Sequence, residues 1–384
     1  MAERARLQNN SETAEARVPS SPSNSQIDGK NRKIPGNTYI ISHRYKTVHV
    51  ETLKDGKEAS KQEFPSVSVE QAYDDLKAMR VHGAGRIARF AAQALGDYAK
   101  DAKARTSKEY WGLVQRAGER LRSARPTAVS LPNGVNYVLY GGRTSFESGG
   151  SVEDIRNATV NTASDFVSSS LDAVKIIGEI GAKRVKNGDV IITHCNSEAA
   201  MSIIKKAHDQ GKGIKVYCDE TRPKFQGHKT AATLAAYGID TTLICDSACR
   251  VTMGAADKAI VGCDAITVNG ALVNKIGTSQ VATIAHEARV NFIVGAESYK
   301  LDFKTLTGEL VDIEERDHAE IASKEWMAHN PKVKFNNPVF DVTPPEYIDF
   351  YVTEKGIVPP GAVFSLMKEL YQYSEGAQAT QGRS

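Results

Sequence analysis

From Gly188 onward, short β-branched runs alternate with amphipathic stretches of helical length, and this alternation constrains the fold more than any other feature. The alternation predicts βαβ units, and therefore a Rossmann-like α/β domain with a mostly parallel sheet covered on both faces. We place this domain at residues 186–384, with a further strand and a closing helix after Asn337. The predicted strands are Asp189–His194, Ile214–Cys218, Thr241–Cys245, Lys258–Val261, Ala265–Val268 and Asn291–Ala296, and the predicted helices are Glu198–Gln210, Lys229–Tyr237, Ser247–Gly254 and Ser279–Val290.

Residues 66–185 show helical periodicity and are predicted to form a separate helical domain. Pro65 precedes a Ser68/Gln71 pair that can cap a first helix. Apolar residues then recur at three- and four-residue spacing up to Gly181. They are Val69, Tyr73, Leu76 and Met79, then Ile87, Phe90, Ala91, Ala94 and Leu95, then Trp111, Val114, Ala117 and Leu121, and finally Ile155, Val160, Ala163, Phe166, Leu171, Val174, Ile177 and Ile180.

The N-terminal segment differs from the rest in composition. Residues 1–36 combine Ser, Asn, Pro, Gly and mixed charges with few large apolar side chains, so we predict a disordered tail. Residues 37–65 alternate apolar and polar positions around Asp55-Gly56, which favours a β-hairpin.

Charge and hydropathy exclude several classes of partner. The chain has 384 residues, with 49 Lys and Arg against 46 Asp and Glu spread along it, so no global footprint for nucleic acid or an anionic membrane is visible. No apolar run is long enough to span a bilayer, and the first residues lack the apolar stretch of a secretory signal. We expect a cytoplasmic protein.

The five cysteines all lie between residues 195 and 263. Their odd number and their places in or beside apolar runs indicate reduced thiols, and we expect four of them to be core residues: Cys218, Cys245, Cys249 and Cys263. Cys245 and Cys249 are four apart, but no second pair or nearby HxxxH completes a zinc signature, so we predict no metal.

Polar side chains gather where the predicted strands end. In an open parallel sheet, ligands bind outside the carboxyl ends of the strands. A thiol, carboxylates and cations at that edge can supply a proton-transfer pair beside an anion site. Each has an alternative role: a strand-end Cys is often buried packing, and Asp246 before Ser247 fits a helix cap. The residues are His194, Cys195, Asn196 and Ser197; Asp219, Glu220, Thr221 and Arg222; Asp246 and Ser247; Cys263 and Asp264; and Glu297, Tyr299 and Lys300.

The segment Arg80–Arg86 contains a Gly-x-Gly-x-x-Ala pattern that superficially matches a dinucleotide fingerprint. A helical pattern, rather than a strand, precedes it, so the structural context of that fingerprint is missing. Glycines that open a helix beside arginine still make a phosphate cradle from free backbone N–H groups. The alternative is a plain helix–helix loop.

Seven motifs, in order over most of residues 75–370, resemble those of one family. The chain is similar to the aldose–ketose isomerases related to the regulatory subunits of the eukaryotic translation-initiation nucleotide-exchange factor, and within them most to the archaeal ribose-1,5-bisphosphate isomerases. The motifs are GAGRIAR (83–89), RPTAVSLPN (125–133), THCNS (193–197), ETRPKFQG (220–227), GCDAITVNGALVNKIGT (262–278), AESYK (296–300) and NPVFDVTPPEYID (337–349).

The resemblance implies roles for particular residues. Cys195 matches the family's proton acceptor and Asp264 its proton donor. Where the relatives usually carry Arg-Gly-Ala-Gly, this chain has His82 in place of the arginine, so one guanidinium contact to phosphate is lost or replaced, with Arg80 or Arg86 as candidate substitutes. The implied sugar-phosphate contacts are His82, Gly83, Ala84, Gly85, Arg125, Asn274, Lys275 and Lys300, with Ser197 close to the thiol.

The implied reaction converts ribose 1,5-bisphosphate to ribulose 1,5-bisphosphate. Phosphate blocks the anomeric oxygen, so an acid must protonate the ring oxygen and a base must remove the C2 proton. Asp264 can be that acid only if burial raises its pKa. Cys195 can be that base only as a thiolate, which a helix N-terminus and nearby cations such as Lys275 or Arg125 favour.

Two other functions remain open from the sequence. A methylthioribose-1-phosphate isomerase would need an apolar pocket in place of one phosphate site, and a non-catalytic scaffold like the initiation-factor subunits would not need the Cys195/Asp264 pair. The resemblance further implies a homo-oligomer, either a dimer or a hexamer, and AMP as an activator in a pathway from nucleoside monophosphates to a carboxylase. We expect no cofactor, because proton transfers alone complete the reaction.

Overall fold

The computed structural model describes residues 63–370, which fall within one compact unit. The predicted tail at 1–36 lies outside the described residues. So does the predicted hairpin at 37–65, apart from its last three residues, which form no strand.

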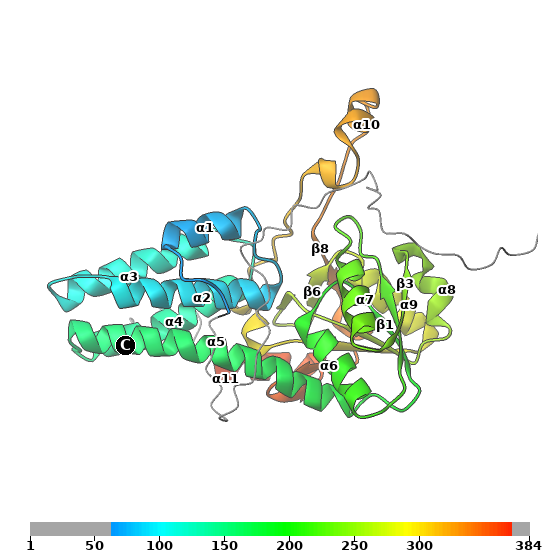
Figure 1. Ribbon diagram of the computed structural model, residues 1–384, viewed down its shortest axis with the longest axis horizontal. Helices are drawn as coiled ribbons and strands as arrows, with labels where there is room; N and C mark the ends of the chain where they lie inside the picture. The colour runs from blue at the N-terminus through cyan, green and yellow to red at the C-terminus, as the bar shows by residue number, and fades with distance from the viewer. Residues whose placement is uncertain (1–62, 371–384) are drawn as a thin grey trace, which may run out of the picture. The chain divides into compact units, whose positions relative to one another are not determined.

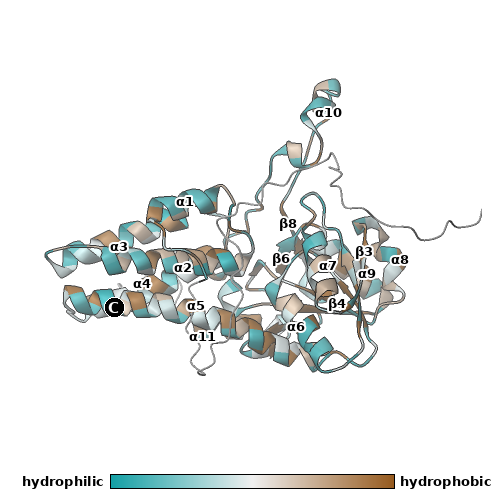
Figure 2. Cartoon of the chain, in the orientation of Figure 1, coloured by the Kyte–Doolittle hydropathy of each residue, from teal (hydrophilic) through white to brown (hydrophobic). Residues whose placement is uncertain are grey.

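Five helices precede the sheet, and the predicted periodicity falls on four of them, α1, α2, α3 and α5. The five are α1 (Val69–Lys77), α2 (Ala84–Asp101), α3 (Ser107–Arg122), α4 (Ser130–Glu147) and α5 (Val152–Ala182). The predicted cap is present, since Ser68 Oγ accepts the N–H of Gln71 at 3.1 Å. Helix α1 ends before Met79, which has a φ of 54° and does not belong to the helical face we predicted. Helices α2, α4 and α5 pack against one another (Figure 1), and hydrophilic and hydrophobic residues lie side by side along them (Figure 2).

Helix α4 was not singled out by its sequence, because it contains Pro132 and several glycines. Those glycines allow close helix packing. A Cβ on Gly141 would lie 2.0 Å from Thr162 Oγ1, and one on Gly142 would lie 2.4 Å from Thr159 Oγ1, both on α5. Glycine therefore lowers the helix propensity of α4 while permitting its contact with α5.

The main sheet has seven strands in the order β10-β9-β7-β4-β1-β2-β3. All neighbouring pairs are parallel except β9 and β10, as predicted for a mostly parallel sheet. Helix α5 contacts α6, which connects the helical region to the sheet. The strands are β1 (Val190–Thr193), β2 (Lys215–Asp219), β3 (Asp240–Ile244), β4 (Lys258–Val261), β7 (Asn291–Gly295), β9 (Phe350–Thr353) and β10 (Gly356–Val358), and the intervening helices are α6 (Glu198–Asp209), α7 (Gln226–Ala236), α8 (Cys249–Met253) and α9 (Thr278–Ala288).

A second, three-stranded antiparallel sheet was not predicted. It consists of β5 (Ala265–Ile266), β6 (Leu272–Lys275) and β8 (Phe340–Thr343) in the order β5-β6-β8. After residue 337 the chain thus forms three strands, β8 to β10, where we predicted one, followed by the predicted closing helix α11 (Val363–Leu370). A short helix, α10 (Lys324–His329), lies in the connection between β7 and β8.

The cysteines we expected in the core are not all there. Cys218, Cys249 and Cys263 are buried, but Cys245 is exposed. It follows β3, the edge strand of the main sheet, whose residues are mostly open to solvent, so our core assignment of Cys245 was wrong. Within residues 63–370, no helix is both long and apolar enough to cross a membrane.

Candidate active site

Cys195 lies in a constrained turn between β1 and α6. Its φ is 66°, in the left-handed region that non-glycine residues rarely adopt. Two threonines hold this conformation: the N–H of Cys195 donates to Thr221 Oγ1 at 2.9 Å, and Thr230 Oγ1 donates to the Cys195 carbonyl at 2.7 Å. Strained backbone kept by such contacts often occurs at functional sites. Ser197, the N-cap of α6, accepts the N–H of Ala200.

Asp264 lies close to the Cys195 turn, although 69 positions separate the two residues in the chain. It follows β4, and its N–H donates to the carbonyl of Val273 at 3.0 Å. Gly262, two residues earlier, packs so tightly on Ser197 that a Cβ there would lie 2.2 Å from Ser197 Oγ. Both Cys195 and Asp264 are partly exposed. The thiol and the carboxyl therefore meet at the carboxyl end of the sheet.

Burial dominates the electrostatics of this pair. It raises the pKa of the Cys195 thiol to about 11; the positive charge of Lys275 opposes the shift, while Asp264 and Asp246 add to it. Burial also raises the pKa of Asp264, against the opposing charges of Lys275, Lys300 and Arg125. The raised pKa of Asp264 is what an acid at this place requires. The thiol is held protonated, although we expected nearby cations to favour the thiolate.

Asn274 and Lys275 lie on β6 of the second sheet. Asn274 is buried, and its side-chain amide donates to Thr278 Oγ1 at 3.0 Å. Lys275 is partly exposed, with its ammonium 5.0 Å from the centre of the Phe340 ring. Lys275 carries the positive charge of this pair of residues, and it acts electrostatically on both Cys195 and Asp264.

Lys300 is buried at the end of β7, in a short 3-10 helix. Its ammonium lies 2.6 Å from Glu297 Oε2. The pKa of Lys300 is raised, because attraction to Glu297 and neighbouring negative groups outweighs burial. Asp264 is among those groups, so Lys300 forms part of the electrostatic surroundings of the candidate acid.

The glycine segment begins α2 as predicted. Gly83 has a φ of 90° and forms the N-cap of α2 without a side-chain hydrogen bond. Helix α1, rather than a strand, precedes it, so the dinucleotide fingerprint fails its structural test. A Cβ on Gly85 would lie 2.9 Å from Tyr299 Oη and 3.2 Å from Glu297 Oε1. Only glycine therefore lets the start of α2 approach the segment that carries Lys300.

His82 lies among four positive charges, of which Arg125 alone was among the contacts implied by the family resemblance. Its ring is exposed, and its pKa is lowered, first by partial desolvation and then by four nearby cations. These are Lys229, Arg316, Arg125 and Lys224. Arg80 pairs with Asp75, and Arg86 lies 3.4 Å from Glu63, so both candidate substitutes for the missing arginine have acidic partners. Lys224 lies in the ETRPKFQG motif but had no predicted role, and Lys229 and Arg316 lie outside the seven motifs. These three cations come from distant parts of the chain, so their approach to His82 could not be inferred from the sequence.

Arg125 is buried and held by a residue that the motifs did not single out. Its Nη2 donates to Glu314 Oε2 at 2.8 Å, and Thr127 Oγ1 lies 3.4 Å from the same oxygen. The other oxygen of Glu314 lies 3.0 Å from Arg316 Nε. Glu314 thus orients two guanidinium groups near His82.

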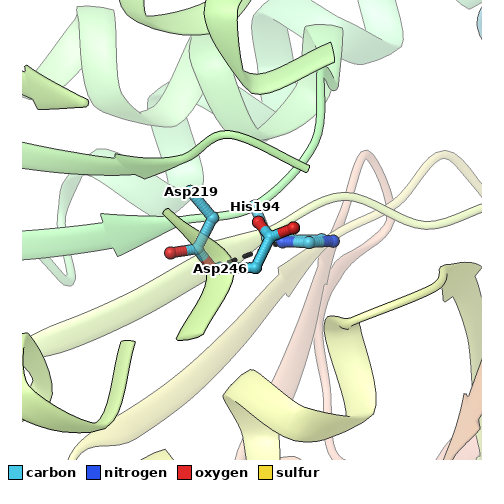
Figure 3. A group of neighbouring side chains, drawn as sticks. All are labelled: His194, Asp219 and Asp246. Carbon is cyan, nitrogen blue, oxygen red and sulfur yellow. Dashed lines mark hydrogen bonds and ion pairs between the residues drawn. The ribbon is translucent and has the colours of Figure 1, made fainter. Parts of the chain in front are cut away.

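Beside the thiol, one group of described side chains has the composition of a metal site: His194, Asp219 and Asp246, whose nearest ligand atoms lie within 4.8 Å of one another (Figure 3). All three have protein partners. His194 Nδ1 lies 3.3 Å from Asp219 Oδ2, and the carboxylate of Asp246 accepts the N–H groups of Thr221 and Arg222, each at 2.7 Å. Asp246 therefore fixes the turn after β2, and does not cap its own helix as we considered. The group is better explained as a hydrogen-bonded cluster than as a metal centre.

Comparison with known proteins shows which family the chain resembles. The family described as "Initiation factor 2 subunit family" matches residues 80–360. A ribose 1,5-bisphosphate isomerase from Pyrococcus furiosus is 47% identical over 302 residues, covering 78% of this chain and 93% of that protein. A methylthioribose-1-phosphate isomerase from Acetivibrio thermocellus is 36% identical over 75% of this chain and 87% of its own length.

A solved structure shares the fold as well as the sequence pattern. The translation initiation factor eIF-2B of Pyrococcus horikoshii OT3 superposes with a TM-score of 0.65 at 30% identity, covering 76% of this chain and 97% of that one. The family match extends over well over half of the chain, and the isomerase relative is similar over nearly its whole length. This chain belongs to the initiation factor 2 subunit family.

Proposed function

We propose that this protein is an isomerase that converts ribose 1,5-bisphosphate to ribulose 1,5-bisphosphate. The observation that carries the proposal is the proximity of Cys195 and Asp264 at the carboxyl end of the sheet, where cations act on both. The similarity to ribose 1,5-bisphosphate isomerases, at 47% and 48% identity over most of the chain, supports this substrate.

Asp264 is the proposed acid. In ribose 1,5-bisphosphate the C1 oxygen outside the ring carries phosphate, so the ring opens only if the ring oxygen receives a proton as its bond to C1 breaks. Burial raises the pKa of Asp264 and thereby favours the protonated form that can give this proton. The carboxylate left behind is stabilised by Lys275 and Lys300, whose charges act on Asp264.

Cys195 is the proposed base. As a thiolate it takes the C2 proton, and the C2–H electron pair forms the double bond of a phosphoenolate. A proton then adds at C1, the C2 hydroxyl loses its proton, and the product is the ketose with all atoms retained. With a thiol pKa of about 11, little thiolate is present at neutral pH, and Lys275 is the neighbouring cation that favours its formation.

The two groups of cations match a substrate with a phosphate at each end. One group surrounds His82 and includes Arg125, Arg316, Lys224 and Lys229. The other consists of Lys275 and Lys300 near Asp264. We propose that Gly83, Ala84 and Gly85 contribute backbone N–H groups to the first, because the N-terminus of α2 has no side-chain cap. Asn274, beside Lys275, and Ser197, which packs on Gly262 two residues before Asp264, are proposed to contact the substrate near the second group.

A comparison of two substrates tests this assignment. Purified protein is incubated with ribose 1,5-bisphosphate or with methylthioribose 1-phosphate, and the ketose is followed by ³¹P and ¹³C NMR. We expect turnover of the bisphosphate with kcat/KM at least about tenfold higher, since one lost charged contact changes binding by about that factor. Preference for methylthioribose 1-phosphate would identify the other isomerase activity, and turnover of neither would support a non-catalytic scaffold.

We further propose that the protein is a cytoplasmic homo-oligomer, a dimer or a hexamer, that AMP activates it, and that it acts in the conversion of nucleoside monophosphates to a carboxylase substrate. The surface supports self-association, because Leu243 on edge strand β3 and Val251 on α8 are 44% and 86% exposed. Five free cysteines are consistent with a reducing compartment. For AMP the support is the family resemblance alone, and added AMP should raise the isomerisation rate.

A further inference from the structure

His194 lies between two segments of the proposed active site. It precedes Cys195, is 2% exposed, and uses both ring nitrogens. Nδ1 lies 3.3 Å from Asp219 Oδ2, and Nε2 lies 2.9 Å from the carbonyl oxygen of Ile276, the residue after Lys275. Figure 3 shows the ring beside the two carboxylates. The side chain thus connects the end of β1 to the segment after β6.

Hydrogen-bond chemistry fixes where the protons of this connection lie. A carbonyl oxygen can only accept, so Nε2 carries a proton and donates it to Ile276. Nδ1 and Asp219 Oδ2 then share one further proton, whichever of the two atoms holds it. Burial raises the pKa of Asp219, while His194 opposes the shift, and the other oxygen of Asp219 is buried without a hydrogen-bond partner. The carboxylate of Asp219 therefore has His194 as its side-chain partner, through Oδ2.

The segment after Lys275 is shaped to receive the ring. Gly277 has a φ of 100°, and a Cβ there would lie 2.7 Å from His194 Cε1. From the other side, Asp341 on β8 accepts the N–H of Gly277 at 2.7 Å and the N–H of Ser279 at 3.1 Å. The turn after Lys275 is held between the imidazole and a carboxylate.

We propose that His194 is a positioning residue that ties the Lys275–Gly277 segment to the Cys195 turn and so keeps the Lys275 ammonium beside the thiol. This inference rests on the proposed function and adds a role that neither Cys195 nor Asp264 can fulfil. Because Coulomb attraction weakens with distance, a small displacement of Lys275 removes the main cation that favours the thiolate. Placement errors of about 1 Å can lower turnover on the order of a hundredfold.

Five charged groups surround the Cys195 thiol and the His194 ring. Lys275 on β6, Asp264 after β4 and Asp246 after β3 act on the Cys195 thiol. Asp219 on β2 and Asp341 on β8 act with or on His194. Lys275 is the one cation among these five groups, so His194 can change the acidity of the thiol chiefly by moving Lys275.

The test compares His194→Ala with His194→Gln, whose amide nitrogen can still donate to the Ile276 carbonyl. The rate of Cys195 alkylation by iodoacetamide is measured from pH 7 to 10 by mass spectrometry of its peptide, which separates it from the exposed Cys245. Below the pKa of about 11 this rate is proportional to the thiolate fraction, so a raised thiol pKa lowers the rate at each pH. We expect His194→Ala to raise the thiol pKa and to lower kcat on the order of a hundredfold, with a smaller change in KM. His194→Gln should restore most of the wild-type thiol pKa and most of the wild-type kcat.

A double-variant cycle separates positioning from general stability. Lys275→Gln alone should raise the thiol pKa of Cys195, and adding His194→Ala to it should raise that pKa no further. An undiminished effect of His194→Ala in the Lys275→Gln background would overturn the proposal, as would a wild-type thiol pKa in a folded His194→Ala protein. If His194→Ala does not fold, Asp219→Asn, which loosens the ring and keeps its volume, replaces it in the same cycle.

Alkylation requires no turnover, so this readout is independent of the substrate. Wild-type protein that isomerises neither sugar phosphate, yet shows the predicted dependence of the thiol on His194 and Lys275, would refute the proposed function and leave the positioning role standing. If the wild type isomerises ribose 1,5-bisphosphate but substitution of His194 leaves the thiol pKa unchanged, the positioning role would be refuted and the proposed function would stand.

Discussion

At the scale of single residues, the predicted strand ends placed Cys195, Asp264 and Lys300 at one edge of the sheet, and the family resemblance singled out the first two as a catalytic pair and added Arg125 and Lys275. The balance of forces on them could not be predicted. Proximity of Lys275 was expected to favour a thiolate, whereas burial keeps the thiol protonated with a pKa of about 11. Whether desolvation or a cation prevails depends on how much protein covers the sulfur, and a linear sequence does not contain that quantity.

The raised pKa values predict the shape of the pH–rate profile. The active form has Cys195 ionised and Asp264 protonated. Because the pKa of the base, about 11, exceeds that of the acid, the population of this form rises about tenfold per pH unit up to the pKa of Asp264 and is constant from there to about 11. We expect kcat/KM to show this plateau and to fall above it. A maximum confined to neutral pH would contradict the assignment.

Asp264 should also weaken the fold at neutral pH. A carboxyl whose pKa is raised by folding resists ionisation, so its stability penalty is absent below the unfolded pKa and grows as the pH rises through the folded pKa. Asp264→Asn should therefore raise the melting temperature by a few degrees, about 2–4 °C, at pH 8 and leave it unchanged at pH 3. A lower melting temperature at pH 8 would show that Lys275 and Lys300 outweigh burial.

At the scale of elements, periodicity located α2, α3, α5 and most strands of the main sheet. It failed where close contacts override propensity. Helix α4 carries glycines that bring it against α5, and β6 was quoted within a family motif but was not predicted as a strand. The antiparallel pairing of β6 with β8 joins residues more than 60 positions apart, which local patterns cannot reveal.

Helix packing gives a direct test of this explanation. A Cβ on Gly96 of α2 would lie 2.6 Å from the Cβ of Ala163 on α5, and neither atom can rotate away. We expect Gly96→Ala to lower the free energy of unfolding by about 1–3 kcal/mol. Gly254→Ala, where a Cβ would have no neighbour within 4 Å, is the matched control and should change stability by less than about 1 kcal/mol in urea melts. Equal losses in both variants would refute the packing argument.

At the scale of the whole molecule, buried ionic contacts connect the helical region to the sheet. Arg89 on α2 is fully buried, with Nη2 3.0 Å from Glu198 at the start of α6 and Nε 2.6 Å from Glu63. The GAGRIAR motif contained this arginine, but its partners could not be inferred, because Glu198 is 109 positions away. Apolar residues near edge strand β3 are exposed in the structure. The sequence pattern had predicted a sheet that is covered on both faces, including this strand.

Self-association can be tested at that edge. Val251 is 86% exposed on α8, and an aspartate there would place a charge in a buried apolar contact between copies. We expect Val251→Asp to shift the protein to a smaller species in size-exclusion chromatography with light scattering. Leu310→Asp, at a residue 91% exposed elsewhere, is the control and should leave the mass unchanged. An unaltered mass for Val251→Asp would remove this face from the proposed interface.

The central claim is that Cys195 and Asp264 isomerise ribose 1,5-bisphosphate by proton transfer. The most direct measurement is ribulose 1,5-bisphosphate formation by the wild type, Cys195→Ser and Asp264→Asn, with circular dichroism to confirm folding. We predict clear turnover by the wild type and a loss on the order of 10³-fold or more in each variant, as expected when an acid or base is removed. Near-normal turnover in either folded variant, or none in the wild type, would contradict the account.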